Sequence, residues 1–351
     1  MIVTRTLFRV TLGGGGTDLP SYYARHDGFV FAMGIDKFMY IMLNPPIVDR
    51  KIRLHYSRSE TVDRLEELQH ELAREALRLH GIEDRIEISS MADLPDGTGL
   101  GSSGSYLVGL LTALHHYRRD YVALQVLAEE ACQLELDVLQ KVVGKQDQYM
   151  AVYGGLTVLE IAREGRVTPR VVELGSGAAR AFVANTHLYY TGVRRSAVEV
   201  LEDQHAAMNG NAQARRDQVE DALHRIKDVG YRILEAISEE NFDEWGRLLH
   251  EHWCHKQRLS PKVSLSEVDE IYEYVREEFG VLGGKLAGAG GGGFLMLYAP
   301  REHRRLERFM AERGMMRLHY DIVHEGSKVI ANLASAPPAP AGHRPVVVAG
   351  G

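Results

Sequence analysis

The stretch Pro95-Asp-Gly-Thr-Gly-Leu-Gly-Ser-Ser-Gly-Ser105 lies between an expected strand, 85–91, and an expected apolar helix, 102–116. Its spaced glycines let backbone N–H groups converge on one point without interference from side chains. Ser102 and Ser103 would open the helix, where unpaired N–H groups and the helix dipole attract anions. The stretch therefore favours a phosphate cradle over a plain connection with a serine N-cap.

The cradle stretch must be compared with two common phosphate-binding motifs, neither of which it fits. A P-loop requires G-x-x-x-x-G-K followed by Ser or Thr, and no segment has that pattern. Gly99, Gly101 and Gly104 satisfy G-x-G-x-x-G, and Asp120 lies about 20 residues further on. In a dinucleotide-binding fold that acid must end a second strand, but here the chain enters another amphipathic helix. The context therefore excludes the dinucleotide-binding fold.

Glycine is also concentrated in two further stretches. The 351-residue chain has 35 glycines, and fifteen of them fall in the cradle, in FRVTLGGGGTDLP at 8–20 and in GGKLAGAGGGGF at 283–294. Four consecutive glycines cost backbone entropy that a simple turn does not require. We therefore expect the last stretch to approach a ligand or a neighbouring loop closely.

The composition is that of a globular protein, with 45% hydrophobic and 25% charged residues. Helices and strands are mixed rather than strictly alternating, which favours an α+β, two-domain enzyme over a doubly wound sheet. We expect domains at 1–180 and 181–334, followed by a disordered Pro/Ala/Gly-rich tail at 335–351.

The expected elements follow from hydrophobic periodicity and turn residues. We expect helices at 61–80 and 122–139, one more helix near the end of the fold, and three helices between 197 and 279. Strands are expected at 2–12, 156–161, 181–190 and 294–298, and two strand-like runs lie within 28–43. The polar run at 144–148 is expected to be a loop between two helical stretches.

Charge and cysteine content limit the partners and the compartment. The net charge is −7 and the isoelectric point is near 6.2, whereas a nucleic-acid binder usually carries a basic stripe. No apolar run is long enough for a membrane span, and Met1–Val10 lacks the features of a signal peptide. Cys132 and Cys254 cannot build a disulfide framework. We therefore expect no nucleic-acid or membrane partner and a cytoplasmic location.

Together, the three glycine-rich stretches resemble the GHMP kinase family, which includes galactokinase, homoserine kinase and mevalonate kinase. The family's Arg-Val strand ending in Gly-x-x-Thr-Asp is similar to residues 9–18, and its Pro-x-x-x-Gly-Leu-Gly-Ser-Ser-Ala loop is similar to 95–104. Its Gly-Ala-Gly-Gly-Gly-Gly motif is similar to 288–293. The resemblance implies an N-terminal domain like domain 2 of ribosomal protein S5, a ferredoxin-like C-terminal domain, and an active site between them.

Within the family, the chain is similar to sugar kinases that act on D-glycero-D-manno-heptose 7-phosphate, at 14–20, 144–149, 190–196 and 285–294. Those enzymes phosphorylate the anomeric hydroxyl and form the 1,7-bisphosphate. The chain departs from the pattern at Gly104-Ser105, where a small apolar pair is usual. Similar kinases act on an octose 8-phosphate or on free sugars such as fucose or galactose, and the motif residues do not separate these substrates.

Two other functions are alternatives to a sugar kinase. Some galactokinase relatives bind sugar without turnover, but the presence of Asp147, Arg9, Ser103 and Glu135 argues for catalysis. A mevalonate-type kinase is less favoured because Gly-Lys-Gln-Asp-Gln at 144–148 is polar, as a sugar site requires.

The resemblance also implies roles in ATP and Mg²⁺ binding and in proton transfer. The ATP phosphates would lie on Pro95, Gly97, Gly99, Leu100, Gly101, Ser102, Ser103 and Gly104. Ser103 and Glu135 would hold Mg²⁺, which prefers oxygen ligands. Asp147 would accept the proton of the sugar hydroxyl, and Arg9 would orient Asp147 or stabilise the transferred charge. Lys145 is an alternative for part of the role of Arg9.

A small-molecule sugar phosphate is the partner that the resemblance implies. Its hydroxyls would bind at Thr17 and Asp18 and near Gly290 and Gly291. Its terminal phosphate would be bound by Arg195 and Arg194, because a guanidinium group binds phosphate in a bidentate manner. For Arg194, a solvated surface position is an equal alternative. The oligomeric state, a homodimer included, stays open.

The sequence His250-Glu251-His252-Trp253-Cys254-His255 resembles a metal-binding cluster. The helical zinc motif H-E-x-x-H would need a histidine at position 254, where Cys254 stands. Residues 250 and 254 share a helix face, whereas 252 points elsewhere. The sequence therefore argues against a zinc site, and Lys256 with the following Leu-Ser fits the helix–loop pattern of the family.

Overall fold

A long antiparallel pair of strands forms the centre of the first sheet. In the computed structural model, which describes residues 1–194 and 197–333, β1 (Ile2–Gly14) pairs along its whole length with β2 (Gly28–Asn44). Branched and aromatic residues dominate both strands and suit a pleated, buried surface. From Phe8 onward β1 is buried on both faces, because helices cover it on each side.

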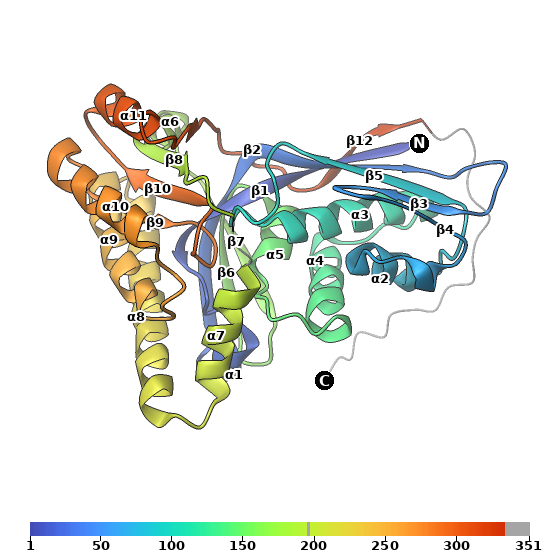
Figure 1. Ribbon diagram of the computed structural model, residues 1–351, viewed down its shortest axis with the longest axis horizontal. Helices are drawn as coiled ribbons and strands as arrows, with labels where there is room; N and C mark the ends of the chain where they lie inside the picture. The colour runs from blue at the N-terminus through green and yellow to red at the C-terminus, as the bar shows by residue number, and fades with distance from the viewer. Residues whose placement is uncertain (195–196, 334–351) are drawn as a thin grey trace.

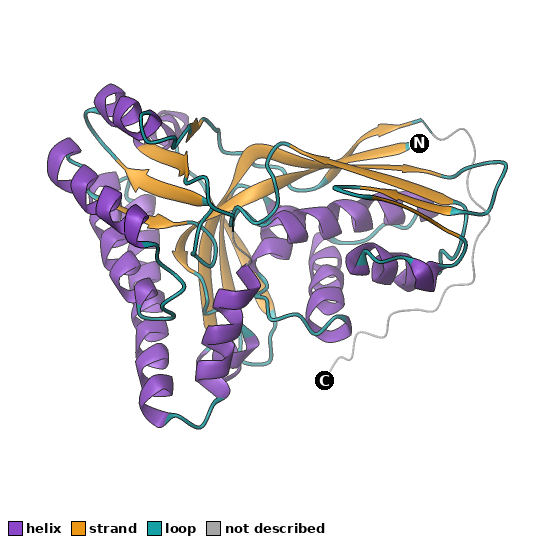
Figure 2. Cartoon of the chain, in the orientation of Figure 1, coloured by secondary structure: helices purple, strands orange, loops and turns teal. Residues whose placement is uncertain are grey.

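Around this pair the first sheet has eight strands (Figures 1 and 2). The first half of β2 pairs with β6, and its second half pairs with β5, so the sheet divides along β2. The remaining pairings complete the sheet with β3 (Ile52–His55), β4 (Ser59–Val62), β5 (Ile86–Ala92), β6 (Leu156–Ile161), β7 (Val167–Val172) and β12 (Lys328–Asn332).

Helices of the first half pack beside this sheet (Figure 1). α3 contacts both β1 and β2, and α5 and α4 pack against α3 in turn. These helices are α2 (Glu71–Leu79), α3 (Ser102–Arg118), α4 (Leu124–Gln133), which continues as a π-helical turn (Leu134–Val138), and α5 (Gln146–Tyr153).

The second sheet has four antiparallel strands in the order β11-β8-β10-β9. These are β8 (Thr186–Tyr190), β9 (Gly283–Leu286), β10 (Phe294–Tyr298) and β11 (Arg317–Leu318). The nearby helices are α6 (Ser176–Asn185), α7 (Ala197–Asn209), α8 (Gln213–Ser238), α9 (Phe242–Gln257), α10 (Ser266–Phe279) and α11 (His303–Ala311).

Helix α8 connects the two halves, since it contacts both β1 and α9. A short helix, α1 (Pro20–His26), follows β1 and contacts α7. One junction therefore brings together the first glycine-rich stretch, the start of α1 and helices of the second half. This junction positions the site described below.

The α+β class expected from the sequence is confirmed, but several elements differ. Residues 61–80 contain the end of the edge strand β4, a short 3-10 turn and α2. The side chain of His70 caps the start of α2 by accepting a hydrogen bond from the Ala73 N–H. The expected strand at 181–190 begins only at Thr186, because its apolar first half belongs to α6. Four helices, not three, occupy 197–279, and 28–44 is one strand.

The domain boundary near residue 180 stays a prediction. That residue falls within α6, and β12 returns at the end of the described chain to pair with β1 of the first sheet. The expected tail, 335–351, lies outside the described residues. Within 1–194 and 197–333, every helix is too short or too polar to span a membrane.

Candidate active site

A pocket of about 650 Å³ opens where the glycine-rich stretches meet. Its walls come from the end of β1 with the turn after it, the cradle before α3, the start of α5, and residues of α9 and β9. Of the residues expected to form the site, those lining the pocket are Arg9, Asp18, Gly97, Gly99, Gly101, Ser102, Ser103, Asp147 and Arg194.

The cradle lies at the N-terminus of α3, as the sequence predicts. The helix begins at Ser102, and its N-cap Gly101 has φ of 85°, a conformation that favours glycine. The first N–H groups of a helix have no partner within it, so they are available to an anion in the pocket. Pro95 is exposed and Leu100 is buried, and neither lines the pocket.

The third glycine stretch packs directly against the cradle. A Cβ atom on Gly288 would lie 2.6 Å from the Gly99 Cα, so only glycine fits there. Gly288 lines the pocket, but Gly290 and Gly291 do not, and both lie against the backbone of Val263. The expected close approach is therefore an approach to neighbouring loops.

Asp147 lies in the first turn of α5 rather than in the loop expected from the sequence. Arg9 fixes its carboxylate: Nε donates to Oδ1 at 2.8 Å, and Nη2 lies 2.6 Å from the same oxygen. Arg9 Nη1 donates to the Gly99 carbonyl at 2.6 Å, which ties the pair to the cradle. A Cβ on Gly104 would lie 2.7 Å from the Asp147 Cβ, so the glycine lets α3 and α5 approach.

Lys145 does not share the role of Arg9 in this arrangement. Its ammonium group donates to Glu129 at 3.0 Å and to the Gly165 carbonyl at 2.7 Å. The residue is buried and lies outside the pocket lining. Lys145 therefore anchors the loop before α5 instead of contacting Asp147.

Asp18 lies beside the start of α5, in the same pocket as Asp147. Its Oδ2 accepts from the Gln146 N–H at 3.2 Å, and a Cβ on Gly144 would lie 1.9 Å from that oxygen. Burial raises the pKa of Asp18, and the nearby Asp147 raises it further. The neighbouring Thr17 is differently placed, because its hydroxyl donates to the Phe29 carbonyl at 2.7 Å and it does not line the pocket.

Glu135 lies beneath the cradle in the π-helical turn after α4, where it is buried. Its Oε2 accepts from Gln148, and the nearby Ser103 side chain favours the charged form of the carboxylate. Burial raises the pKa of Glu135 to about 7, and Asp147 adds to the effect. Oε1 has no hydrogen-bond partner among the described residues. A buried carboxylate oxygen left unpaired next to a serine hydroxyl fits a Mg²⁺ ligand set.

The pocket wall formed by α9 and β9 contains residues that sequence reasoning did not assign to the site. Lys256 donates to the carbonyls of Leu286 at 2.8 Å and Gly288 at 2.6 Å. Lys285 donates to the Leu12 carbonyl at 3.2 Å, and His252 Nε2 lies 2.7 Å from the Gly14 oxygen. The signal available for Lys285 was its place within the third glycine stretch, on a short strand between glycines.

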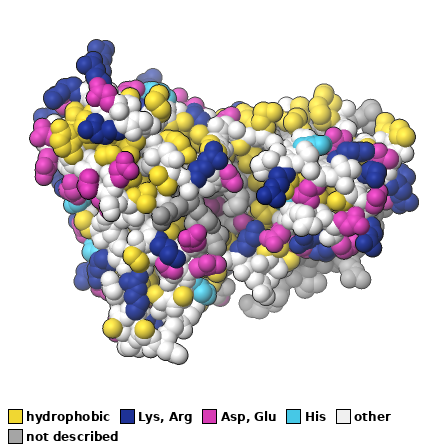
Figure 3. All heavy atoms as spheres, viewed as in Figure 1, with side chains coloured by type: hydrophobic (Ala, Val, Ile, Leu, Met, Phe, Trp, Pro, Cys, Tyr) yellow, Lys and Arg dark blue, Asp and Glu magenta, His cyan; other side chains and the backbone are white. Residues whose placement is uncertain are grey.

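Arg194 lies at the pocket mouth with its side chain 57% exposed. Its Nη1 is 3.9 Å from the Asp96 Oδ1, which belongs to the cradle stretch. Arg195 lies outside the described residues. On the face shown in Figure 3, acidic and basic side chains are interspersed without forming a continuous stripe of one sign.

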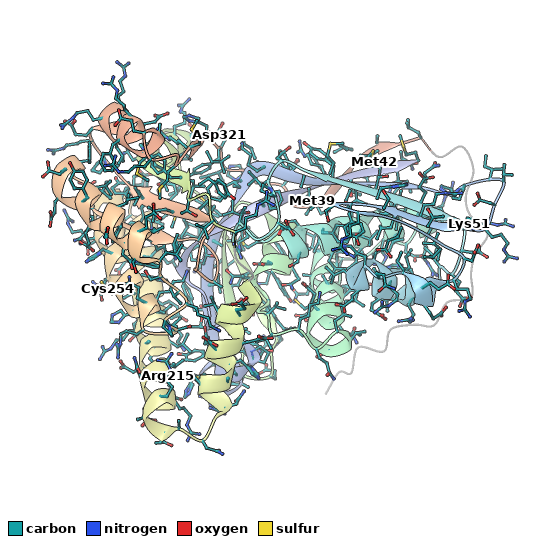
Figure 4. All side chains as sticks on the ribbon, in the orientation of Figure 1. Met39, Met42, Lys51, Arg215, Cys254 and Asp321 are labelled. Atoms are coloured by element: carbon teal, nitrogen blue, oxygen red, sulfur yellow. The ribbon has the colours of Figure 1, made fainter. Side chains whose placement is uncertain are left out.

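His250 and His252 on α9 contact different residues outside the helix. His250 Nδ1 lies 2.9 Å from the Tyr272 hydroxyl, whereas His252 faces Gly14. Cys254 is exposed on the outer side of the same helix (Figure 4). The register mismatch inferred from the sequence is therefore present in the helix.

Comparison with known proteins places these elements in one family. Residues 63–155 match the family model described as GHMP kinases N terminal domain, and residues 233–314 match GHMP kinases C terminal. The first match contains the cradle at 95–105 and Asp147, and the second contains the third glycine stretch at 283–294.

Individual relatives cover the chain more fully. D-glycero-alpha-D-manno-heptose 7-phosphate kinase of Campylobacter jejuni is 26% identical over 343 residues, which cover 93% of this chain and 98% of the relative. L-fucokinase/L-fucose-1-P guanylyltransferase of Bacteroides fragilis is 27% identical over 88% of this chain, but only 36% of that protein is covered. The solved structure of a D-glycero-D-manno-heptose 1-phosphate kinase from Bacteroides thetaiotaomicron shares the fold, with a TM-score of 0.78 and 19% identity. The alignment covers 95% of this chain and 100% of that structure's chain.

Proposed function

This chain belongs to the GHMP kinase family, and we propose that it is an ATP-dependent sugar-phosphate kinase. The proposed acceptor is D-glycero-D-manno-heptose 7-phosphate, phosphorylated on its anomeric hydroxyl to the 1,7-bisphosphate. The similarity to the heptose 7-phosphate kinase over nearly the whole of both chains supports this acceptor. An octose 8-phosphate or a free sugar is the alternative, and the fucokinase similarity supports a related acceptor.

One observation carries the proposal: Asp147 is held by Arg9 against the cradle, in the same pocket as Asp18. A phosphate cradle, a candidate base and a buried acceptor of hydroxyl hydrogen bonds are the three parts that transfer to a sugar requires. Positioning and charge stabilisation supply most of the catalysis in phosphoryl transfer. The pocket brings these three parts together.

The reaction follows from this placement. The ATP phosphates bind at the N-terminus of α3, and Asp18 orients the sugar through its hydroxyls. Asp147 accepts the proton of the anomeric hydroxyl. At the same time the oxygen of that hydroxyl forms a bond to the γ-phosphorus of ATP, and the bond from this phosphorus to ADP breaks. An aspartate is a weak base. However, the anomeric hydroxyl is more acidic than other sugar hydroxyls, so a strong base is not required.

Arg9 keeps the Asp147 carboxylate oriented and adds positive charge beside the transferred group. Ser103 and Glu135 would hold Mg²⁺, which when bound neutralises charge on the nucleotide phosphates. Arg194 and Arg195 remain candidates for binding the terminal phosphate of the sugar.

The proposal is tested by measuring ATP turnover against a panel of heptose, octose and hexose phosphates together with free fucose and galactose. The highest kcat/KM is expected with the heptose 7-phosphate. Preference for another member would correct the acceptor while keeping the kinase. Absence of turnover with every member, in protein that binds ATP, would contradict a sugar kinase and favour a sugar sensor.

A further inference from the structure

Three lysines are buried in the part of the chain that the structure describes: Lys145, Lys256 and Lys285. Lys145 lies outside the pocket and is paired with the carboxylate of Glu129. Lys256 and Lys285 both line the pocket, and their ammonium groups donate to backbone carbonyls. The Lys256 ammonium also lies 5.8 Å from the centroid of the Trp253 ring, which carries no net charge. Within 1–194 and 197–333, no carboxylate oxygen lies within 4.0 Å of either ammonium group.

Two buried ammonium groups without a counter-charge are unfavourable in the free protein. Removing such a charge from water costs several kcal/mol, on the order of the penalty for one ion of a buried pair, and carbonyl dipoles offset only part of it. Burial lowers the pKa of Lys256 to about 7, and burial with repulsion from Lys256 lowers the pKa of Lys285 well below its ordinary value. Titratable groups with pKa values shifted in this way concentrate at ligand-binding and catalytic sites.

The surroundings of the two lysines point to an anion that enters through the pocket. Lys256 contacts the Gly288 carbonyl, and Gly288 packs on Gly99 of the cradle. Lys285 contacts the end of β1 at Leu12. Neighbouring charges do not compensate them. His252 on the same wall is buried, which lowers its pKa well below the ordinary value, and Arg9 on the opposite wall repels both lysines.

We propose that Lys256 and Lys285 form a phosphate-binding subsite on the wall of the pocket made by α9 and β9. The ligand assignment rests on the proposed kinase function, whereas the preference for an anion rests on the lysines themselves. An ammonium group binds phosphate as a compact point charge. The phosphoryl group comes from one of two sources, the transferred group of ATP or the terminal phosphate of the acceptor.

Direct binding tests the subsite without requiring turnover. Lys256→Met and Lys285→Met remove each charge and keep most of the aliphatic volume, and Lys262→Met is the matched control, because Lys262 is a partly exposed lysine paired with Asp203. Inorganic phosphate should raise the melting temperature of the wild type and of the control. The apparent affinity should fall about 10- to 100-fold in the two subsite variants, the range expected for a hydrogen bond to a charged group.

Folding of each variant is checked by circular dichroism. If a methionine variant does not fold, it is replaced by Lys256→Gln or Lys285→Gln, because glutamine retains a hydrogen-bond donor for the carbonyls. Equal stabilisation of wild type and both subsite variants by phosphate would overturn the proposal. Because this measurement needs no acceptor, it can fail or succeed independently of the kinase function.

Steady-state kinetics distinguish the two sources of the phosphoryl group. If the subsite binds the acceptor phosphate, KM for the sugar phosphate rises about 10-fold or more, while KM for ATP and turnover of the unphosphorylated sugar stay unchanged. If it binds the transferred group, kcat falls with phosphorylated and unphosphorylated acceptors alike. Kinetic constants equal to those of the wild type in both variants would overturn the proposal.

Discussion

The two walls of the pocket solve the problem of buried charge in opposite ways. On the wall made by β1, the cradle and α5, Arg9 and Asp147 compensate each other and are tied to the backbone at Gly99. On the wall made by α9 and β9, Lys256 and Lys285 donate to backbone carbonyls, and no carboxylate of the described residues pairs with either. The first wall is organised before any ligand binds, and the second becomes electrostatically balanced only when an anion is present.

This difference suggests a division of work between the walls. A base must be oriented in advance, because geometry errors of about 1 Å can cost about 10²-fold in rate. The positive charge of an anion subsite can remain without a counter-charge in the free protein, because the bound anion offsets the unfavourable free energy of the buried charge.

The largest effect is expected for Asp147→Asn, which removes the base and keeps the side-chain shape. The value of kcat should fall about 10²–10⁴-fold, the usual contribution of general base catalysis, while ATP affinity stays nearly unchanged. Turnover and ATP binding should be measured on one preparation, with Asp63→Asn as the control, since Asp63 is an exposed acid outside the pocket. Near-normal turnover would remove Asp147 from the role of base.

A smaller loss is expected for Gly104→Ala, which disturbs the organised wall without changing its chemistry. The new Cβ would lie 2.7 Å from the Asp147 Cβ and 2.9 Å from its backbone carbon, so α5 must shift. A fall in kcat of about 10- to 100-fold is expected from this displacement. Gly177→Ala, where nothing lies within 4 Å of the new atom, serves as the control. Unchanged kcat in Gly104→Ala would show that the contact does not position Asp147.

The smallest effects are expected on the free energy of unfolding. They should have opposite signs for a buried lysine that pairs with a carboxylate and for one that does not. Lys145→Met removes the ammonium donor to Glu129 Oε2 and to the Gly165 carbonyl, while the Tyr149 hydroxyl still donates to Glu129 Oε1. A loss of about 1–3 kcal/mol in the free energy of unfolding is expected. Lys256→Met removes an uncompensated buried charge and should raise stability near pH 7. Both are measured by denaturant unfolding of the ligand-free protein. Destabilisation of equal size in both variants would contradict the contrast between the walls.

The gain from Lys256→Met should also depend on pH. The ammonium pKa is about 7 in the folded chain against an ordinary 10.5, so between these values the unfolded chain binds more protons. This group therefore makes the wild type more stable as the pH rises from 7 towards 10.5, and the advantage of the variant should shrink over that range. A gain independent of pH would contradict a depressed pKa at Lys256.

The elements that sequence reasoning located well are those with strong local signals. The cradle at 95–105 and the start of α3 at Ser102 follow from glycine spacing and serine placement, and β6 and β10 were located from short apolar runs between turns. The apolar run at 181–185 gave no comparable signal, because residues that pack in a buried helix and in a buried strand look alike over five positions.

The missing parts of the site depend on tertiary contacts. Lys256 and Lys285 are 29 positions apart in sequence and meet only because α9 packs on β9. Nothing in the local pattern distinguishes Lys145, which pairs with Glu129, from Lys256, which does not. The sequence also places Gly290 and Gly291 beside the ligand, whereas the fold directs them towards Val263.

Identification of the reaction product tests the central claim most directly. Heptose 7-phosphate and ATP are incubated with the wild-type protein, and phosphorus NMR with proton coupling locates the new phosphate. The account predicts a phosphorus signal coupled to the anomeric proton, formed in equal amount to ADP, and formed about 10²–10⁴-fold more slowly with Asp147→Asn. A new phosphate on any other carbon, or ADP release without a sugar bisphosphate, would contradict it.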